Sequence, residues 1–121
     1  MSEVEREESM DIDEEQDLTK IKLLPGSTKD GSAASFQISD EDHTLGNALR
    51  YIIMKNPDVE FCGYSIPHPS EAKLNLRIQT YGESTAIEAL HKGLADLSDL
   101  CTHVEETFAG AVSEGNYSNE A

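Results

Sequence analysis

The segment that decides the fold is His43-Thr44-Leu45-Gly46-Asn47-Ala48-Leu49-Arg50, which continues directly into Tyr51-Ile52-Ile53-Met54. Its apolar side chains recur every three or four residues, on one face of an α-helix: Leu45, Ala48, Leu49, Ile52 and Ile53. Gly46 lies beside that face. Because glycine inside a helix costs about 1 kcal/mol relative to alanine, we expect a packing reason, with another backbone coming close at the missing Cβ. The stripe therefore predicts a docking helix and indicates assembly rather than catalysis.

The residues around this helix predict its two ends. Asp42 or His43 can cap the N-terminus of the helix, where a carboxylate interacts favourably with the helix dipole. Asn56-Pro57 ends the helix, because proline disfavours helical geometry in the residue before it. The helix therefore separates two regions with strand patterns.

Four segments carry those strand patterns. Residues 20–24 alternate weakly between apolar and polar side chains, whereas 34–38 and 73–80 alternate strictly. Residues 59–66 are rich in strand-forming side chains. We expect 59–66 and 73–80 to pair as antiparallel neighbours across the proline-rich link at 67–70, with one face of the sheet in water.

A second helix begins at Thr85, where Thr85-Ala86-Ile87-Glu88 forms a capping box. Its apolar positions then step by three and four: Ile87, Leu90, Leu94, Leu97, Cys101, Val104, Phe108 and Ala111. Running to about Val112, the helix spans about 40 Å at 1.5 Å per residue. A domain of this size has a diameter of roughly 34 Å. Part of the stripe therefore needs a second chain.

An autonomous coiled coil is an alternative explanation of the long stripe. It would place complementary charges beside the stripe, but the flanking positions hold other residues: His91, Ser98 and Glu105 on one side, and Gly93, Leu100 and Thr107 on the other. We therefore favour a helix packed on a sheet and against a partner helix. The order β-β-α-β-β-α predicts an α+β fold, with a four-stranded antiparallel sheet, two helices packed on one face and a long C-terminal helix.

Charge divides the chain into parts. Residues 1–17 hold nine carboxylates against Arg6 alone, a balance of -8, which leaves -7 of the formal -15 for the other residues. Such a like-charge block repels itself and buries little, so we expect a disordered acidic tail over 1–19. The dimerisation domain is expected at 20–113 and a flexible C-terminal tail at 114–121. The acidity also argues against direct DNA binding, which needs clustered Lys and Arg.

The two cysteines, Cys62 and Cys101, are too few and too far apart for a disulfide framework or a paired-cysteine metal motif. We expect both thiols to lie in the core of a protein from a reducing compartment. No apolar run approaches the roughly 18 residues of a membrane span, and no signal peptide is evident. The sequence therefore predicts no membrane association.

No residue set indicates catalysis, a cofactor or a metal. The four histidines lack zinc-protease spacing, and His91 and His103 are about 120° apart on their helix, so they cannot share a ligand. One enzyme class stays open. Pterin dehydratases share small α+β folds of this kind and use clustered histidines, so His43, His68 and a helix histidine would have to converge. A third interpretation is that the chain is an acidic adaptor protein, which acts on its own and not as part of a larger enzyme.

Three motifs in this chain resemble the α-like subunits of DNA-dependent RNA polymerases. They are the segment from Asp42 to Arg50 with 51–56 behind it, Gly63-Tyr64-Ser65-Ile66-Pro67-His68-Pro69, and Leu76-Arg77-Ile78-Gln79-Thr80. The resemblance covers about residues 20–112. Within that family, the sequence of the second motif and the acidic N-terminal extension resemble those of the smaller α-like subunit shared by eukaryotic RNA polymerases I and III. Archaeal subunit L and the bacterial α N-terminal domain are its relatives.

The resemblance implies a non-catalytic assembly subunit. It would heterodimerise with the larger α-like subunit and form a platform for the large catalytic subunits in rRNA, 5S rRNA and tRNA transcription, in the nucleus and nucleolus. Carried over by position, Leu45, Gly46, Leu49, Ile52 and Ile53 would line the dimer and core face. Asn47 and Arg50 would contact the second-largest subunit. Helix length itself adds the second set of partner-binding residues: Leu90, Leu94, Leu97, Val104 and Phe108.

The resemblance also implies an absence. The chain departs from bacterial α, which has a second inserted domain and a C-terminal DNA-binding domain. We therefore expect no promoter contact from this chain. We derive no role for Pro67-His68-Pro69 beyond a rigid connection at the surface.

Overall fold

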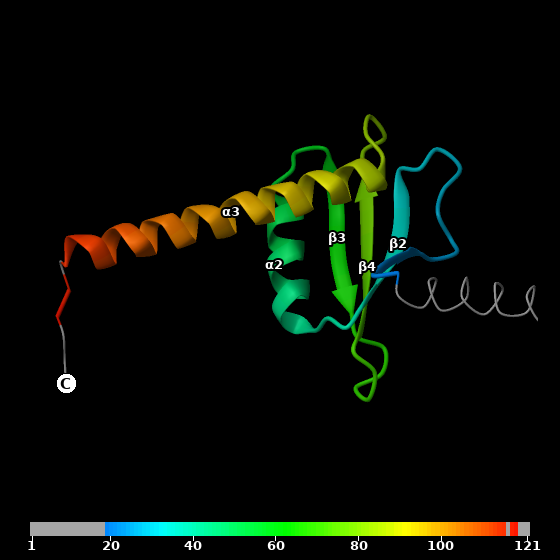
Figure 1. Cartoon of the computed structure of the whole chain (residues 1–121). Coiled ribbons are helices and arrows are strands. Elements are labelled where there is room, and N and C mark those ends of the chain that lie inside the picture. Colours follow the sequence, from blue (N-terminus) through cyan, green and yellow to red (C-terminus); the bar gives the residue numbers. More distant parts are fainter. Residues whose placement is uncertain (1–18, 116, 119–121) are drawn as a thin grey trace, which may run out of the picture.

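The computed structural model describes residues 19–115 and 117–118. Its elements follow the predicted β-β-α-β-β-α order (Figure 1). They are β1 (Ile21–Leu23), β2 (Ala33–Ser39), α2 (His43–Met54), β3 (Val59–Ser65), β4 (Lys73–Thr80) and α3 (Ala86–Glu114). The expected disorder of the acidic tail falls on residues 1–18, and part of the expected C-terminal tail on 116 and 119–121. Those predictions lie outside the described residues.

The four strands form one antiparallel sheet in the order β1-β2-β4-β3. β3 and β4 pair across the proline-rich link as predicted, with Tyr64 opposite Leu76. β2 reaches the other side of β4, where Phe36 also faces Leu76. β2 and β4 are thus the central strands, and they are the two that alternate strictly in sequence. Strict alternation follows because one face of each strand packs on helices while the other meets water.

Both helices cover the same face of the sheet, and the core lies between the two layers (Figure 1). The largest fully buried side chains come from both layers: Ile38, Leu49, Ile53, Leu74, Leu76 and Ile78. The apolar residues of the two strictly alternating segments, 34–38 and 73–80, all lie in this core. The core is therefore formed by this chain alone over the first half of its long helix.

The prediction for the two thiols is half wrong. Cys62 is buried in the core on β3, and this burial raises its pKa to about 11, while the charge of Arg50 lowers it in part. Cys101 is exposed on α3, because the sheet does not extend under that part of the helix. A thiol within an apolar stripe is thus no evidence of burial in its own chain.

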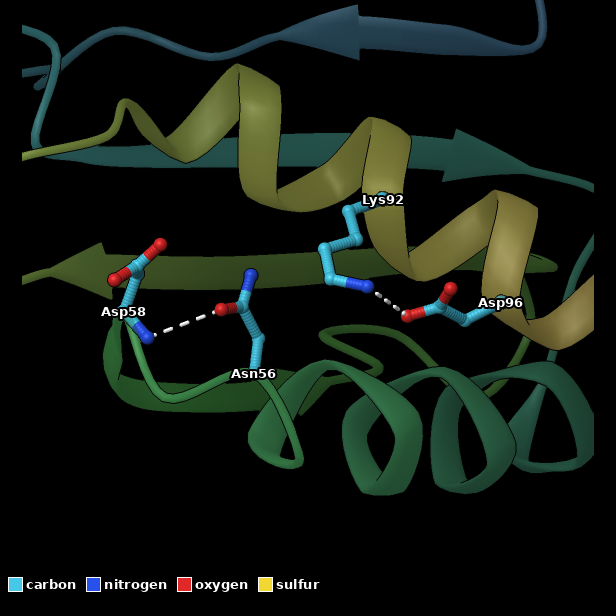
Figure 2. Close-up of polar contacts among 4 residues, drawn as sticks. All are labelled: Asn56, Asp58, Lys92 and Asp96. Atoms are coloured by element: carbon cyan, nitrogen blue, oxygen red, sulfur yellow. Dashed lines mark hydrogen bonds and ion pairs between the residues drawn. The ribbon is translucent and has the colours of Figure 1, made fainter.

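Local hydrogen bonds fix the ends of α2. Asp42 caps it, and its Oδ1 accepts the backbone N–H of Thr44 at 2.9 Å. Asn56, after the helix, is buried, and its Oδ1 accepts the backbone N–H of Asp58 at 3.0 Å (Figure 2). This side-chain turn redirects the chain into β3.

The ends of α3 follow the same logic. Thr85 is the N-cap, and its Oγ1 accepts the backbone N–H of Glu88 at 3.2 Å, as the capping box predicts. Gly115 closes the helix in the left-handed region, at φ 67°. Lys92 and Asp96 form a partly exposed ion pair of 2.8 Å one turn apart on α3 (Figure 2). The 29 residues of α3 span about 43 Å.

Candidate partner interface on the long helix

α3 has two halves with different surroundings. In the first half, Ala86, Ala89, Leu90 and Gly93 are buried, and Leu94 and Leu97 pack partly against the core. From Ser98 to Glu114 every residue is exposed. That second half projects beyond α2 and the sheet (Figure 1), over about 25 Å at 1.5 Å per residue. We call residues 98–114 the α3 arm.

The apolar stripe continues onto the arm without interruption. At 100° per residue, its apolar side chains lie within an arc of about 120°: Leu97, Leu100, Cys101, Val104, Phe108, Ala111 and Val112. Phe108 is 70% exposed and Val104 is 58% exposed. Fully covering side chains of this size is worth about 1.5–3 kcal/mol each. A contiguous apolar strip of this kind is a candidate surface for contact with another protein.

The charges on the arm all have one sign. Between Ser98 and Glu114 there are four carboxylates (Asp99, Glu105, Glu106, Glu114) and no Lys or Arg. Glu105 borders the apolar stripe, whereas Asp99 and Glu106 lie on the far side of the helix. A partner surface that covers the apolar stripe is therefore electrostatically complementary to the arm if basic side chains surround its apolar centre.

The stripe of α2 is used differently from the stripe of the arm. Leu49 and Ile53 are almost completely buried in the core between the helices and the sheet of this chain. Leu45 and Ile52 are partly buried against the same core. Of the predicted partner-binding residues on α2, only these last two leave apolar surface for another chain.

Gly46 has a packing reason, although not the expected one. A Cβ at this position would lie 2.7 Å from Leu74 Cδ1 and 2.7 Å from Tyr64 Cε2. The close neighbours are therefore side chains of the sheet in the same molecule. The expectation that another backbone approaches Gly46 is wrong, because the sheet side chains fill that space.

Tyr64 joins two of the sequence motifs in space. Its hydroxyl lies 2.9 Å from His43 Nδ1, and the guanidinium carbon of Arg50 lies 5.7 Å from the centroid of its ring. His43, Gly46 and Arg50 follow one side of α2, so the helix rests on this ring. Arg50 Nη2 also donates to Asn47 Oδ1 at 3.4 Å, and both of these side chains are exposed. Sequence reasoning did not identify Tyr64 as the contact.

Gly93 was also missed. A Cβ there would overlap Ile53, so the glycine lets α3 cross close to α2. The signal was present in the sequence: Gly93 is three residues after Leu90 and four before Leu97, on the apolar face. Gly46, by contrast, lies at the edge of the apolar stripe of α2.

The pterin-dehydratase alternative required three histidines to converge. His43 is at the start of α2 with Tyr64 as its partner, whereas His91 and His103 lie exposed on α3. Within residues 19–115 and 117–118, no three His, Cys, Asp or Glu side chains form a group that could hold a metal ion. In the same described part of the chain, no helix is both long enough and apolar enough to span a membrane. The geometry does not favour the enzyme alternative.

Comparisons with known proteins show the family to which this chain is similar. Residues 33–107 match the model of the RNA polymerase Rpb3/Rpb11 dimerisation domain. A protein of Saccharomyces cerevisiae, DNA-directed RNA polymerases I and III subunit RPAC2, is 65% identical over 114 residues, which cover 87% of this chain and 80% of the relative. The Caenorhabditis elegans protein named probable DNA-directed RNA polymerase II subunit RPB11 is 41% identical over 93 residues, covering 77% of this chain and 76% of that one.

A solved structure shares the fold. DNA-directed RNA polymerase subunit L of Thermoplasma acidophilum superposes with a TM-score of 0.65 over 82% of this chain and 96% of that one. Its sequence is 18% identical, so this likeness concerns the architecture alone.

Proposed function

This chain belongs to the family of the RNA polymerase Rpb3/Rpb11 dimerisation domain, and from that membership we propose that it is the smaller α-like subunit shared by RNA polymerases I and III. The relative named for polymerases I and III is 65% identical, and the relative named for polymerase II is 41% identical. This difference supports the assignment to polymerases I and III. The subunit is non-catalytic, and it needs no cofactor for its role.

The observation that carries the proposal is the exposed apolar stripe of the α3 arm. A single copy of the fold leaves Val104 and Phe108 in water, at an unfavourable free energy that a partner removes. The partner is the larger α-like subunit, which covers the stripe together with the partly buried Leu94 and Leu97. A second copy of this chain fits less well, because pairing two arms brings carboxylates of like charge together.

A second contact is assigned to the exposed side of α2. Asn47 and Arg50 face solvent there while Arg50 is held over the ring of Tyr64. We assign this side to the second-largest polymerase subunit. The domain that carries both contacts comprises residues 20–113, preceded by the acidic tail at 1–19 and followed by the short tail at 114–121.

The heterodimer would act as the platform on which the large catalytic subunits assemble. The products of the two enzymes are rRNA, 5S rRNA and tRNA, so the subunit serves ribosome biogenesis. It works in the nucleus, including the nucleolus. The chain does not bind DNA directly, because its described surface lacks the dense clusters of Lys and Arg that such contacts require.

Affinity purification of the tagged chain from its own cells tests the proposal. We expect the larger α-like subunit together with subunits specific to polymerase I and to polymerase III, and none specific to polymerase II. Val104→Asp should remove these partners, because it places a charge in the stripe. Glu106→Gln, on the far side of the same helix, is the matched control and should retain them.

Two outcomes would contradict the proposal. Recovery of polymerase II subunits alone would assign the chain to the other enzyme. Recovery of the chain without any polymerase subunit would favour the free adaptor.

A further inference from the structure

The sheet face that the helices leave uncovered is different in character from the rest of the molecule. Ser35, Gln37, Asn75, Arg77 and Gln79 alternate along β2 and β4 with residues of the core, so they lie on this open face. Lys22 and Lys73 border it, opposite Gln37 and Ser39. The four strands contain one carboxylate, Glu60, at the irregularity in β3. In a chain with a formal charge of -15, this face has a small local excess of positive charge, although Lys73 pairs with Glu71 at 4.0 Å.

A hollow of about 380 Å³ lies on this face. Its lining includes Leu24, Ser35, Phe61, Gly63, Asn75 and Arg77. Phe61 is 47% exposed, and its ring lies over Gly63, where a Cβ would come within 2.8 Å of the ring carbon Cζ. The hollow therefore has an apolar wall, formed where the ring of Phe61 packs over Gly63, and polar side chains around it.

Arg77 lies in this hollow with only neutral partners among the described residues. Its Nη1 donates to Ser35 Oγ at 3.2 Å and its Nε donates to Gln79 Oε1 at 3.4 Å. The ion pairs of the described part of the chain involve lysines and leave Arg77 out. A guanidinium has five donors and binds carboxylates best in pairs of hydrogen bonds, so Arg77 retains capacity for an acid.

Asn75 adds a second unmet requirement in the same place. Its Oδ1 is buried and has no hydrogen-bond partner within the described structure. A buried acceptor without a donor costs about 1–3 kcal/mol, and a backbone N–H of an incoming peptide would satisfy it once the Asn75 amide turns toward the hollow. Arg77, Asn75 and Phe61 together favour a peptide that supplies carboxylates, a backbone donor and an apolar side chain.

We propose that the acidic segment of this same chain, residues 1–18, binds across the open face of the sheet, with a carboxylate on Arg77 and an apolar side chain against Phe61. The segment holds nine carboxylates and includes Met10-Asp11-Ile12-Asp13, where acids alternate with apolar side chains. This contact is independent of the heterodimer and adds a role for the tail.

Chain length and position favour this occupant over a separate polypeptide. The described structure begins at Thr19, directly before β1 of the same sheet. Eighteen residues reach up to about 60 Å when extended, whereas four strands span about 15 Å. A tethered segment also acts at an effective concentration of the order of mM, which compensates for weak individual contacts.

Nuclear magnetic resonance of the full chain tests the contact at Arg77. We expect the Arg77 Nε–H and Gly63 amide resonances to shift when Asp11, Asp13, Glu14 and Glu15 are changed to their amides. About 0.5 M salt should produce the same change by screening. Neutralising Asp99, Glu105 and Glu106 on the α3 arm is the matched control, because it removes a similar charge from the other side of the molecule and should leave both resonances in place.

The reciprocal pair of variants tests the same contact from the sheet. Arg77→Gln should shift the resonances of residues 10–15, whereas Lys92→Gln, an equal loss of charge on α3, should not. Unchanged Arg77 and Gly63 resonances after neutralisation of the tail would overturn the proposal. A shift that appears only when the larger α-like subunit is added would overturn it as well, since the hollow would then belong to the partner, and it would leave the polymerase assignment intact.

Discussion

The two halves of α3 carry the same apolar stripe, but only one of them has a sheet beneath it. Residues 86–97 pack on the sheet and on α2, and residues 98–114 are exposed throughout. The step between Leu97 and Ser98 marks where α3 passes beyond the sheet and α2 (Figure 1), and the sequence pattern does not change there. Periodicity therefore identifies an apolar face, whereas the size of the remaining fold decides which part of that face its own chain covers.

This comparison separates two effects that an apolar position can have on the protein. A buried residue in the first half of α3 (86–97), or on the α2 surface that packs against it, contributes to the free energy of unfolding of the chain. In the proposed heterodimer, a residue on the arm contributes to the affinity for the partner and little to the stability of the free chain. Substitutions before Ser98 should therefore change mainly the stability of the chain, whereas substitutions after Leu97 should change mainly the affinity for the partner.

The largest effect is expected on the covered side, at Leu49. Leu49→Asp places an unpaired carboxylate at a position with 0% exposure, so the chain should lose about 4 kcal/mol or more of stability and fail to fold. Circular dichroism and chemical denaturation would measure this loss. Leu49→Met, which keeps the volume, is the control and should cost less than about 1.5 kcal/mol. A folded Leu49→Asp chain that fails only to dimerise would place Leu49 in the partner interface instead.

The arm should show the opposite behaviour at Phe108. Phe108→Asp should weaken binding to the larger α-like subunit by about 2–4 kcal/mol, because large aromatic side chains contribute most to interfaces. The free energy of unfolding of the chain itself should change by less than about 0.5 kcal/mol. Calorimetric titration and denaturation measure the two quantities separately. Unchanged affinity, or a stability loss close to that of Leu49→Asp, would remove the distinction between the halves.

Two glycines extend the comparison to backbone packing. Gly46→Ala should destabilise the chain by about 1–3 kcal/mol, since the added methyl overlaps Tyr64 and Leu74 even though alanine favours helices. Gly110→Ala on the arm is the matched control. A Cβ there meets nothing within 4 Å, so this variant should gain up to about 1 kcal/mol of helix stability. Thermal denaturation of both variants checks the sign, and a stabilised Gly46→Ala chain would contradict the close packing.

The smallest effect concerns the cap of α2. The hydrogen bond from the Thr44 backbone lowers the pKa of Asp42 below its usual 3.8. A carboxyl with a lowered folded-state pKa stabilises the fold above its unfolded-state value and loses that contribution as the pH falls through the folded-state value. The Tm should therefore fall slightly more between about pH 5 and about pH 2 in the natural chain than in Asp42→Asn, whose amide caps equally well at every pH. Identical slopes would show that the charge of the cap contributes nothing.

Much of the fold could be predicted from the sequence because each signal was local. Alternation located β2 and β4, Asp42 and Thr85 marked the helix starts, and proline and glycine placed the turns. The order of strands in the sheet was less accessible, because the pairing of β2 with β4 depends on contacts between distant segments. The exposure of the α3 arm could be anticipated from helix length alone.

The division between core and partner residues could not be predicted in the same way. Leu49 and Phe108 occupy equivalent places in their stripes, and only the position of the sheet distinguishes them. The same limitation explains the wrong expectation for Cys101. It also explains why Tyr64 was missed, since its contacts with His43, Gly46 and Arg50 join segments that the local pattern treats separately.

Hydrogen exchange along α3 tests the central claim most directly. In the free chain at concentrations where it is monomeric, amides of residues 86–97 should be strongly protected and those of 98–114 weakly protected. Addition of the larger α-like subunit should raise protection in 98–114 and leave 86–97 nearly unchanged. Equal strong protection of both halves in the free chain, or no response of the arm to the partner, would contradict the account.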